Sequence, residues 1–198
     1  MPRLLVFSDI HNDAKALAKL METSADLYVA AGDLVSWARG LEKMAEPMQR
    51  HADRVWVMPG NHESEGDIAA FCDRHGFHKF HGHWFEIGGK RVAGLGYSSP
   101  TPFETPGEYS EAEMASRLER FAELKPEILI CHAPPFETAL DRIKPGLHAG
   151  SRAVRDFIEK LQPEYFFCGH IHEAEGQVIE MGKTRAQNVG KKGYLLEW

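Results

Sequence analysis

The chain has 198 residues, of which 43% are hydrophobic and 26% are charged. These values are typical of a soluble domain that builds its own core, and they argue against a disordered chain. The formal net charge of -6 argues against sequence-independent binding to a nucleic-acid backbone, because such binding needs concentrated Lys and Arg.

The cysteine pattern and the hydropathy point to a location. The three cysteines have no C-x-x-C spacing, which indicates reduced thiols rather than a disulfide framework. No run approaches the roughly 18 apolar residues of a membrane span, and the stretch 1–10 reaches the charged Asp9 too early for a signal peptide. We expect one cytoplasmic domain spanning residues 1–198, without membrane association.

The first third of the chain alternates short apolar runs with helical patterns. The predicted strands are Leu4–Ser8, Leu27–Ala31 and Val55–Met58. The predicted helices are Asp13–Met21, Leu41–Arg50 and Asp67–Arg74, with Asp13 or Asn12 as the cap of the first. This β-α-β-α alternation favours right-handed crossovers and a largely parallel sheet.

The remainder of the chain mixes a hairpin, a loop, helices and strands. It begins with a predicted hairpin, His83–Ile87 and Arg91–Leu95 around a Gly-Gly turn, and continues with a proline-rich loop, Tyr97–Tyr109. Next come a helix, a strand, a helix and a strand: Glu111–Leu124, Ile128–Cys131, Ser151–Leu161 and Tyr165–Cys168. Three short strands end the chain and are predicted to be antiparallel: Gln177–Glu180, Thr184–Val189 and Tyr194–Glu197. Either one mixed sheet or two sheets packed face to face would accommodate both the β-α alternation and the antiparallel strands.

Polar residues follow each of five apolar runs. They are Asp9 and His11; Asp33; Asn61, His62 and Glu63; His132; and His170 with His172. Each has an ordinary structural explanation, such as a helix cap, a turn or a hydrogen-bonded loop histidine. Five such coincidences are less probable than one shared site, because ligands bind at the carboxyl ends of strands in α/β sheets.

The residue types indicate the chemistry. Imidazole and carboxylate ligands suit Mn, Fe, Co, Ni or Zn, whereas Mg and Ca prefer oxygen alone. Two neighbouring ions need a bridging ligand, and the carboxylate of Asp33 has two oxygens for that role. Two divalent ions, two carboxylates and a bridging hydroxide would leave a net positive charge that attracts phosphate.

The motifs D-x-H, G-D, G-N-H-E, H-A-P-P and G-H-x-H span residues 9–172 in that order. As a set they resemble the calcineurin-like metallophosphoesterase family. The resemblance implies an α/β fold that is a four-layer α/β-β/α sandwich of two mixed sheets flanked by helices. It implies that one metal takes Asp9, His11, Asp33 and His172, and that the other takes Asp33, Asn61, His132 and His170.

In the same resemblance, His62 would face the substrate as general acid or phosphate contact. Glu63 would orient a neighbouring loop or be exposed. The small size and the segment Cys168–Gly176 are similar to the compact prokaryotic phosphodiesterase branch of the family.

Other residues are weaker candidates for substrate contact. Asn12 would touch a phosphate oxygen or cap the first helix, and His148 would reach the substrate from a loop. Trp37 and Arg39 follow Asp33 closely enough to line its pocket. The cluster of His75, His78, His81 and His83 lacks a carboxylate at matching spacing, which favours ordinary structural roles, although His81 and His83 would share one face of a strand.

The predicted function is metal-dependent hydrolysis of small phosphate esters, diesters preferred, by attack of a metal-bridging hydroxide. The predicted cofactors are two divalent transition-metal ions, with manganese first and iron, nickel, cobalt or zinc as alternatives. A non-catalytic binding scaffold on the same fold and a nuclease are the competing hypotheses, and the acidic charge balance weighs against the nuclease.

Overall fold

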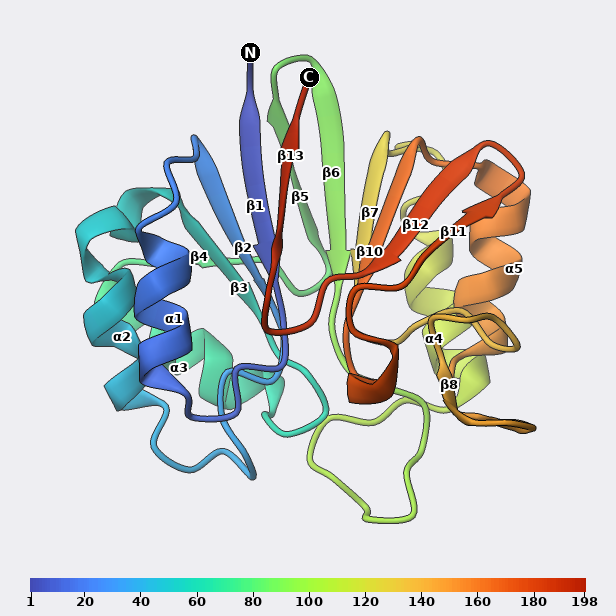
Figure 1. Cartoon of the computed structure of the whole chain (residues 1–198), viewed down its shortest axis with the longest axis horizontal. Helices are drawn as coiled ribbons and strands as arrows, with labels where there is room; N and C mark the ends of the chain where they lie inside the picture. The colour runs from blue at the N-terminus through green and yellow to red at the C-terminus, as the bar shows by residue number, and fades with distance from the viewer.

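Two β-sheets pack face to face in the computed structural model, which describes residues 1–198, and helices cover both outer faces (Figure 1). The predicted four-layer arrangement is confirmed. Both chain termini lie at one edge of the molecule, where β1 begins. The long loop after β6 (Lys90–Leu95) lies at the opposite edge (Figure 1).

The first sheet has the strand order β13-β1-β2-β3-β4. Its strands are β13 (Tyr194–Glu197), β1 (Arg3–Phe7), β2 (Leu27–Ala31), β3 (Val55–Met58) and β4 (His78–Lys79). All pairs are parallel except β1 with β13. Its outer face is covered by α1 (Ala14–Met21), α2 (Glu42–Met48) and α3 (Glu65–His75), with the short 3-10 helix η1 (Gln49–Arg54) after α2.

The second sheet has the strand order β11-β12-β10-β7-β6-β5. Besides β6 it contains β11 (Val178–Met181), β12 (Thr184–Asn188), β10 (Tyr165–Cys168), β7 (Ile128–Cys131) and β5 (His83–Ile87). Its outer face is covered by α4 (Glu111–Glu119) and α5 (Arg152–Leu161). A small hairpin of β8 (Arg142–Lys144) and β9 (Leu147–His148), and the 3-10 helix η2 (His172–Ala174), lie near its carboxyl edge.

Three hydrophobic clusters fill the three spaces between the four layers. The period-two geometry of a strand divides β1 between them: Leu4 and Val6 face the other sheet, whereas Leu5 and Phe7 face the helices. A strand that is buried on both faces has no polar side, which is why these strands are continuous apolar runs in the sequence.

The predicted tail was partly wrong. β11 and β12 are antiparallel as expected, but β12 pairs with β10 in parallel, and β13 crosses to the first sheet to pair with β1. A strand's own residues determine that it is extended, but its partner depends on where the chain returns.

Helix ends show smaller differences. Asp13, rather than Asn12, caps α1, because its side chain accepts the N–H of Ala16 at 3.0 Å. The helix predicted to reach Leu124 ends at Glu119 and continues as turns. A membrane-crossing helix would need a longer apolar stretch than any helix here provides.

Candidate metal centre

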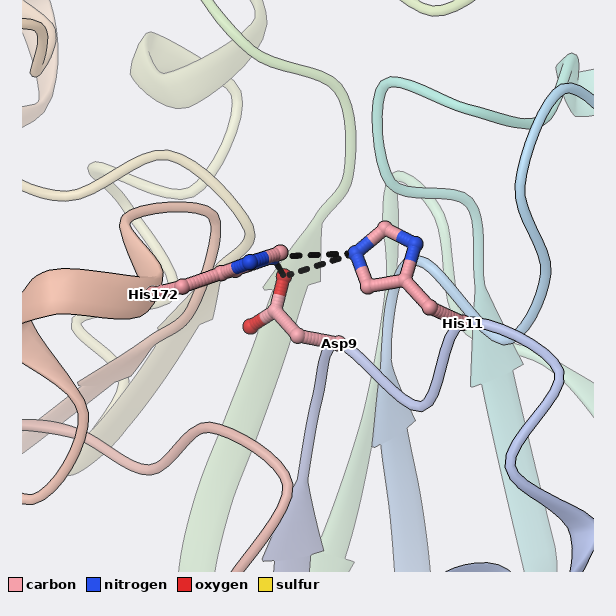
Figure 2. A group of neighbouring side chains, drawn as sticks. All are labelled: Asp9, His11 and His172. Carbon is pink, nitrogen blue, oxygen red and sulfur yellow. Dashed lines mark hydrogen bonds and ion pairs between the residues drawn. The ribbon is translucent and has the colours of Figure 1, made fainter.

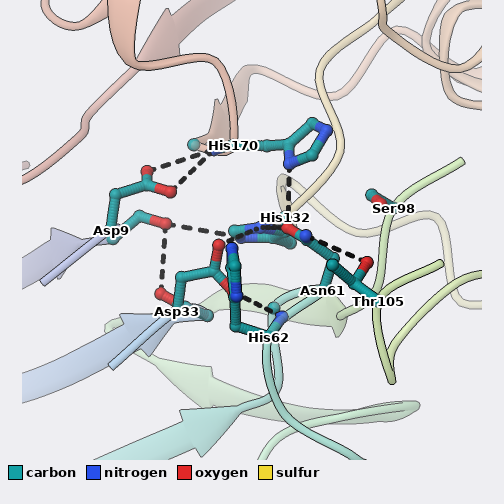
Figure 3. Close-up of polar contacts among 12 residues, drawn as sticks. Asp9, Asp33, Asn61, His62, Ser98, Thr105, His132 and His170 are labelled. Carbon is teal, nitrogen blue, oxygen red and sulfur yellow. Dashed lines mark hydrogen bonds and ion pairs between the residues drawn. The ribbon is translucent and has the colours of Figure 1, made fainter. Parts of the chain in front are cut away.

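Polar side chains from both sheets meet at their carboxyl edge (Figure 3). Asp9, Asp33 and Asn61 follow β1, β2 and β3 of the first sheet, and His132 and His170 follow β7 and β10 of the second. The parallel strands of both sheets end at the same side, so residues far apart in the sequence become neighbours.

One group of donor atoms comprises Asp9, His11 and His172 (Figure 2). The Nε2 atoms of His11 and His172 lie 3.0 Å apart, and Asp9 Oδ1 lies 3.9 Å and 3.6 Å from them, respectively. Nitrogen and oxygen donors this close together could hold a metal ion.

A second group comprises Asp33, His132 and His170, with Asn61 beside them. Asn61 Oδ1 lies 3.2 Å from His132 Nε2 and 2.9 Å from His170 Nδ1. Figure 3 shows these side chains pointing toward one another.

Asp33 lies between the two groups. Its Oδ2 is 3.3 Å from His132 Nε2 and 3.7 Å from His11 Nε2, so one carboxylate faces both sets of donors. The side chain is almost fully buried, which fixes its position.

Neighbouring contacts orient the donors. His132 Nδ1 donates to the carbonyl of Ala31 at 2.9 Å, which turns its Nε2 toward Asn61 and Asp33. The amide of Asn61 donates from Nδ2 to Thr105 Oγ1 at 3.1 Å, which turns its Oδ1 inward. The mixed imidazole, carboxylate and amide donors fit borderline divalent metals, and no cysteine sulfur joins them.

Four of these residues have left-handed backbone conformations. The φ angles of Asp9, His11, Asp33 and His170 are 55°, 46°, 54° and 68°. Non-glycine residues in this region cost of order 1–3 kcal/mol each and cluster at functional sites. These backbone conformations lower the stability of the fold, and they direct the four side chains inward.

Two glycines allow the strand ends to approach closely. A Cβ on Gly60 would lie 2.0 Å from Asp33 Oδ1, and one on Gly169 would lie 2.3 Å from Asp9 Oδ2. Both distances are far below van der Waals contact, so only glycine fits beside either carboxylate.

His132 and the carboxylates of Asp9 and Asp33 favour each other's charged forms. Burial opposes ionisation of Asp33 and Asp9, but the positive charge of His132 and the bonds to neighbouring histidines outweigh it and lower both pKa values. For His132, burial opposes the charged form, but the neighbouring Asp33 raises its pKa to about 9.

The remaining imidazoles are driven toward the neutral form, which is the ligand form. Burial, followed by the charge of His132, lowers the pKa of His170 to about 4. Burial also lowers the pKa of His11, against the attraction of Asp33 and Asp9. His172 is the exception: it is exposed over more than half of its side chain, and its bond to Asp9 raises its pKa.

Glu63 is fully buried and orients its neighbours. Its carboxylate accepts the main-chain N–H groups of Asp33 at 3.1 Å, Val35 at 2.9 Å and Gly60 at 2.9 Å. Burial, reinforced by the charge of Asp33, raises the pKa of Glu63 to about 8. Of the two alternatives for this residue, orientation of the neighbouring loops is therefore the one observed.

His62 lies beside the donors from the first sheet, and one of its ring nitrogens is close enough to the donor atoms of His11 and Asp33 to form a third group with them. Its N–H donates to Asp33 Oδ1 at 2.9 Å, and its Nδ1 accepts the N–H of Trp37 at 3.2 Å. An accepting Nδ1 in a neutral imidazole leaves the proton on Nε2. The ring packs edge-on against His11, with centroids 5.1 Å apart.

Asn12 and His148 are not among these donor groups. The Asn12 side chain is bound to the loop that follows β2. Its Oδ1 accepts from Ser36 N at 2.9 Å, and its Nδ2 donates to Arg39 O at 2.7 Å. His148 Nδ1 lies 2.6 Å from Asp141 Oδ1. Their proposed contact with substrate stays a prediction.

The dense histidine cluster has structural roles. His81 is buried, where Gly96 N–H donates to its Nδ1 and its Nε2 contacts Tyr109 Oη at 2.9 Å. It precedes β5 rather than sharing a strand face with His83, so that detail of the prediction was wrong. His75 pairs with Glu42 on the surface.

Sequence reasoning missed the residues that support the donors. Thr105 holds the Asn61 amide, and Ser36 Oγ lies 3.0 Å from His11 Nδ1. Ser36 lies three residues after the G-D motif, and this proximity is the only indication of its role in the sequence. Nothing near Thr105 in the sequence indicates a contact with Asn61.

Comparison with known proteins gives a consistent family. The sequence pattern of the calcineurin-like phosphoesterases matches residues 2–174. An uncharacterized protein of Methanocaldococcus jannaschii is 29% identical over 207 residues, covering 98% of this chain and 90% of its own length.

Solved structures share the fold. Protein TT1561 of Thermus thermophilus has a TM-score of 0.71 at 22% identity, over 96% of this chain and 89% of its own. The phosphopantetheinyl hydrolase of Mycobacterium tuberculosis has a TM-score of 0.66 at 15% identity, with the same two coverages. A dimetal phosphatase of Danio rerio has a TM-score of 0.62 at 13% identity, over 94% of this chain and 86% of its own.

The family match covers most of the chain, and the motifs that carried the resemblance lie together at one edge of the sandwich. The chain belongs to the calcineurin-like phosphoesterase family.

Proposed function

We propose that this protein hydrolyses small phosphate esters with two divalent transition-metal ions, and that phosphodiesters are preferred. The observation that carries the proposal is the position of Asp33, whose carboxylate faces both groups of donor atoms. A bridging carboxylate between two nitrogen-rich donor sets is what a dinuclear hydrolytic centre needs.

Each ion would have its own ligands. Asp9, His11, Asp33 and His172 would hold one, and Asp33, Asn61, His132 and His170 would hold the other. When bound, the ions would supply positive charge to the phosphate and lower the pKa of water. Manganese is the first candidate, with iron, nickel, cobalt or zinc as alternatives, since a mixed set of imidazole, carboxylate and amide donors is compatible with all of these metals.

His62 is the proposed proton donor. The Trp37 N–H occupies its Nδ1, so the Nε2 proton is the one available for the departing oxygen. The main-chain bond from His62 to Asp33 ties the ring's position to that of the carboxylate. A proton delivered there would prevent the leaving group from departing as an unstable alkoxide.

A substrate and metal panel tests the proposal. Metal-free protein is assayed with p-nitrophenyl phosphate, bis(p-nitrophenyl) phosphate and a single-stranded oligonucleotide after addition of Mn, Fe, Ni, Co, Zn or Mg. We expect turnover of the small diester to exceed that of the monoester, with manganese most effective and the oligonucleotide poor.

Variants separate the roles. Asp33→Asn should lose turnover and lower the number of bound ions measured by elemental analysis. His62→Ala should retain the ions and lose about 10²–10⁴-fold in kcat on a dialkyl phosphodiester, the usual contribution of a general acid. Its loss on the p-nitrophenyl esters should be much smaller, because p-nitrophenolate departs without a proton. His78→Ala, an exposed histidine on β4, serves as the matched control and should behave as wild type. Failure of the wild-type protein to bind any of the metals would favour a non-catalytic scaffold instead.

A further inference from the structure

Two cavities open on the metal centre, one toward each donor group. The first, of about 540 Å³, is lined by Asp9, His11 and His172. The second, of about 360 Å³, is lined by Asp33, Asn61 and His170. His62 and His172 line both cavities, so the centre lies where the two meet.

The first cavity combines one aromatic ring with polar groups. Trp37 is the only hydrophobic residue that lines it, and 47% of this residue is exposed. Trp37 has a left-handed backbone with φ of 54°, and its ring packs edge-on against His62 at 5.5 Å. The contact with His62 places the half-exposed Trp37 ring beside the site.

The rim of this cavity carries both a hydrogen-bond acceptor and a donor. The carboxylate of Glu175 is fixed by the N–H of Lys192 at 2.8 Å, and Lys191 Nζ lies 3.5 Å from Asp13 Oδ2. A flat ring with its own donors and acceptors would stack on Trp37 and bond to this rim, as a nucleobase does.

The second cavity has an apolar outer wall, with Ser99, Thr101 and Glu173 as polar residues in its lining. Its outer wall is formed by Pro100, Pro102 and Phe103 of the long loop, and by Ile143 and Ile171 from β8 and the segment before η2. Phe103 is 70% exposed. An uncovered apolar wall of this kind gains free energy when an alkyl or aryl group covers it.

The loop that forms this wall is held in shape. Glu108 Oε1 accepts three hydrogen bonds, from Thr101 Oγ1 at 2.6 Å and from Thr105 N and Oγ1 at 2.8 and 2.6 Å. Phe103 N–H donates to Thr101 Oγ1 at 3.2 Å. The apolar wall therefore exists before a substrate arrives, which reduces the entropy lost on binding.

The two cavities share His62 and His172 but differ in the chemistry of their walls. We propose that the natural substrate is a phosphodiester with two unlike arms: a nucleoside-like planar polar arm that stacks on Trp37, and an apolar arm that packs against Phe103. This inference rests on the proposed function and narrows its substrate class. A monoester would leave one cavity without an occupant.

Four synthetic diesters test the two arms separately. The phosphate carries either thymidine or abasic deoxyribose through its 5′ oxygen, and either a methyl or a hexyl group as the second ester. Methyl and hexyl alcohols have similar acidity, so differences between them report binding rather than leaving-group chemistry. The products are quantified by chromatography for wild type, Trp37→Ala, Phe103→Ala and the control Trp84→Ala, which removes an exposed aromatic residue that lines neither cavity.

We expect the wild-type protein to prefer the thymidine diesters over the abasic ones by about tenfold in kcat/KM, the usual contribution of one base stacked on an aromatic ring. Trp37→Ala should abolish this preference and keep the preference for hexyl over methyl. Phe103→Ala should abolish the hexyl preference and keep the thymidine preference, and Trp84→Ala should keep both.

A purely structural role for either residue would lower all four rates together and leave both preferences intact, which would overturn the proposal. Equal rates of wild-type protein on all four diesters would also overturn it. Bis(p-nitrophenyl) phosphate is assayed in parallel: its hydrolysis with no arm preference refutes this inference alone, whereas its failure to react with every metal refutes the proposed function as well.

Discussion

Gly60 sets the distance between the ends of β2 and β3. Because a Cβ there would lie 2.0 Å from Asp33 Oδ1 and 2.5 Å from Asp33 N, Gly60→Ala must displace the carboxylate that faces both donor groups. We expect weaker metal binding by calorimetry and a loss of about 10²-fold in turnover, since a misplacement of about 1 Å in a catalytic arrangement can cost that much.

Gly66→Ala is the matched control, because a Cβ there meets nothing closer than Ser64 Oγ at 3.8 Å. It should bind metal as wild type does. Wild-type metal affinity in Gly60→Ala would show that the strand end can relax, and that the tight approach has no role in placing Asp33.

Residue types led to the predicted ligands, but not to the residues that orient them. The seven predicted ligands lie in the two donor groups, because carboxylates and imidazoles after strands carry a local signal. Glu63 was left open because the sequence shows a charge next to a motif, and only the folded chain shows three main-chain N–H groups around it.

The loop 97–109 orients a donor as well as forming a wall. Thr105 Oγ1 donates to Glu108 and accepts from Asn61 Nδ2. Thr105→Val removes the acceptor while keeping the shape, so Asn61 is free to turn its amide away from the histidines. We expect a loss of about 10–100-fold in metal affinity or activity, the usual effect of removing such a supporting contact.

Thr105→Ser restores the hydroxyl without the methyl group and should recover most of the affinity. Equal losses in the Val and Ser variants would mean that the methyl packing, and not the hydrogen bond, supports the site.

The start of β6 is joined to the residue before β7 by an ion pair. Glu127 accepts the main-chain N–H of Arg91 at 2.8 Å and its Nε at 3.0 Å. The side-chain bonds to Arg91 lower the pKa of Glu127 to about 2, from an ordinary value of 4.5. A lowered pKa means that the pair stabilises the fold above pH 4.5 and that this contribution is lost as the pH falls toward 2.

The midpoint of urea unfolding, followed from pH 7 to pH 2, checks this prediction. Wild type should exceed Glu127→Gln at pH 7, and the difference should shrink below pH 4.5. Glu180→Gln, at an exposed position of β11, should track wild type throughout. A difference that stays constant with pH would exclude the ion pair as its cause.

At the scale of the whole molecule, metal binding should stabilise the fold. The site gathers two buried carboxylates and four left-handed residues, and it draws donors from both sheets, so an ion would link the two halves of the sandwich. Ligand linkage gives about 2.7 kcal/mol at a metal concentration 100 times Kd. The Tm of metal-free protein should therefore rise several degrees with added manganese.

Asp33→Asn should show a smaller rise in Tm with manganese, because the substitution weakens both donor groups. EDTA should reverse the rise in wild type. An unchanged Tm across a manganese titration that calorimetry shows to be saturating would mean that binding is equally strong in the unfolded chain.

The sequence alone determined most of the strands and predicted the donors. Two strands, Val55–Met58 and Ile128–Cys131, can be identified from the sequence directly. A strand buried on both faces must be apolar throughout and must end where polar residues begin. Both properties are local, so no knowledge of the partner strands is needed.

Only the tertiary structure decided the partners and the space around the donors. β12 and β13 are as strand-like as any other element, yet one joins β10 in parallel and the other crosses to β1, since pairing depends on packing across the whole chain. The two cavities arise in the same way: Trp37 and Phe103 come from separate loops, and only the packing of the two sheets brings one loop beside each group of donor atoms.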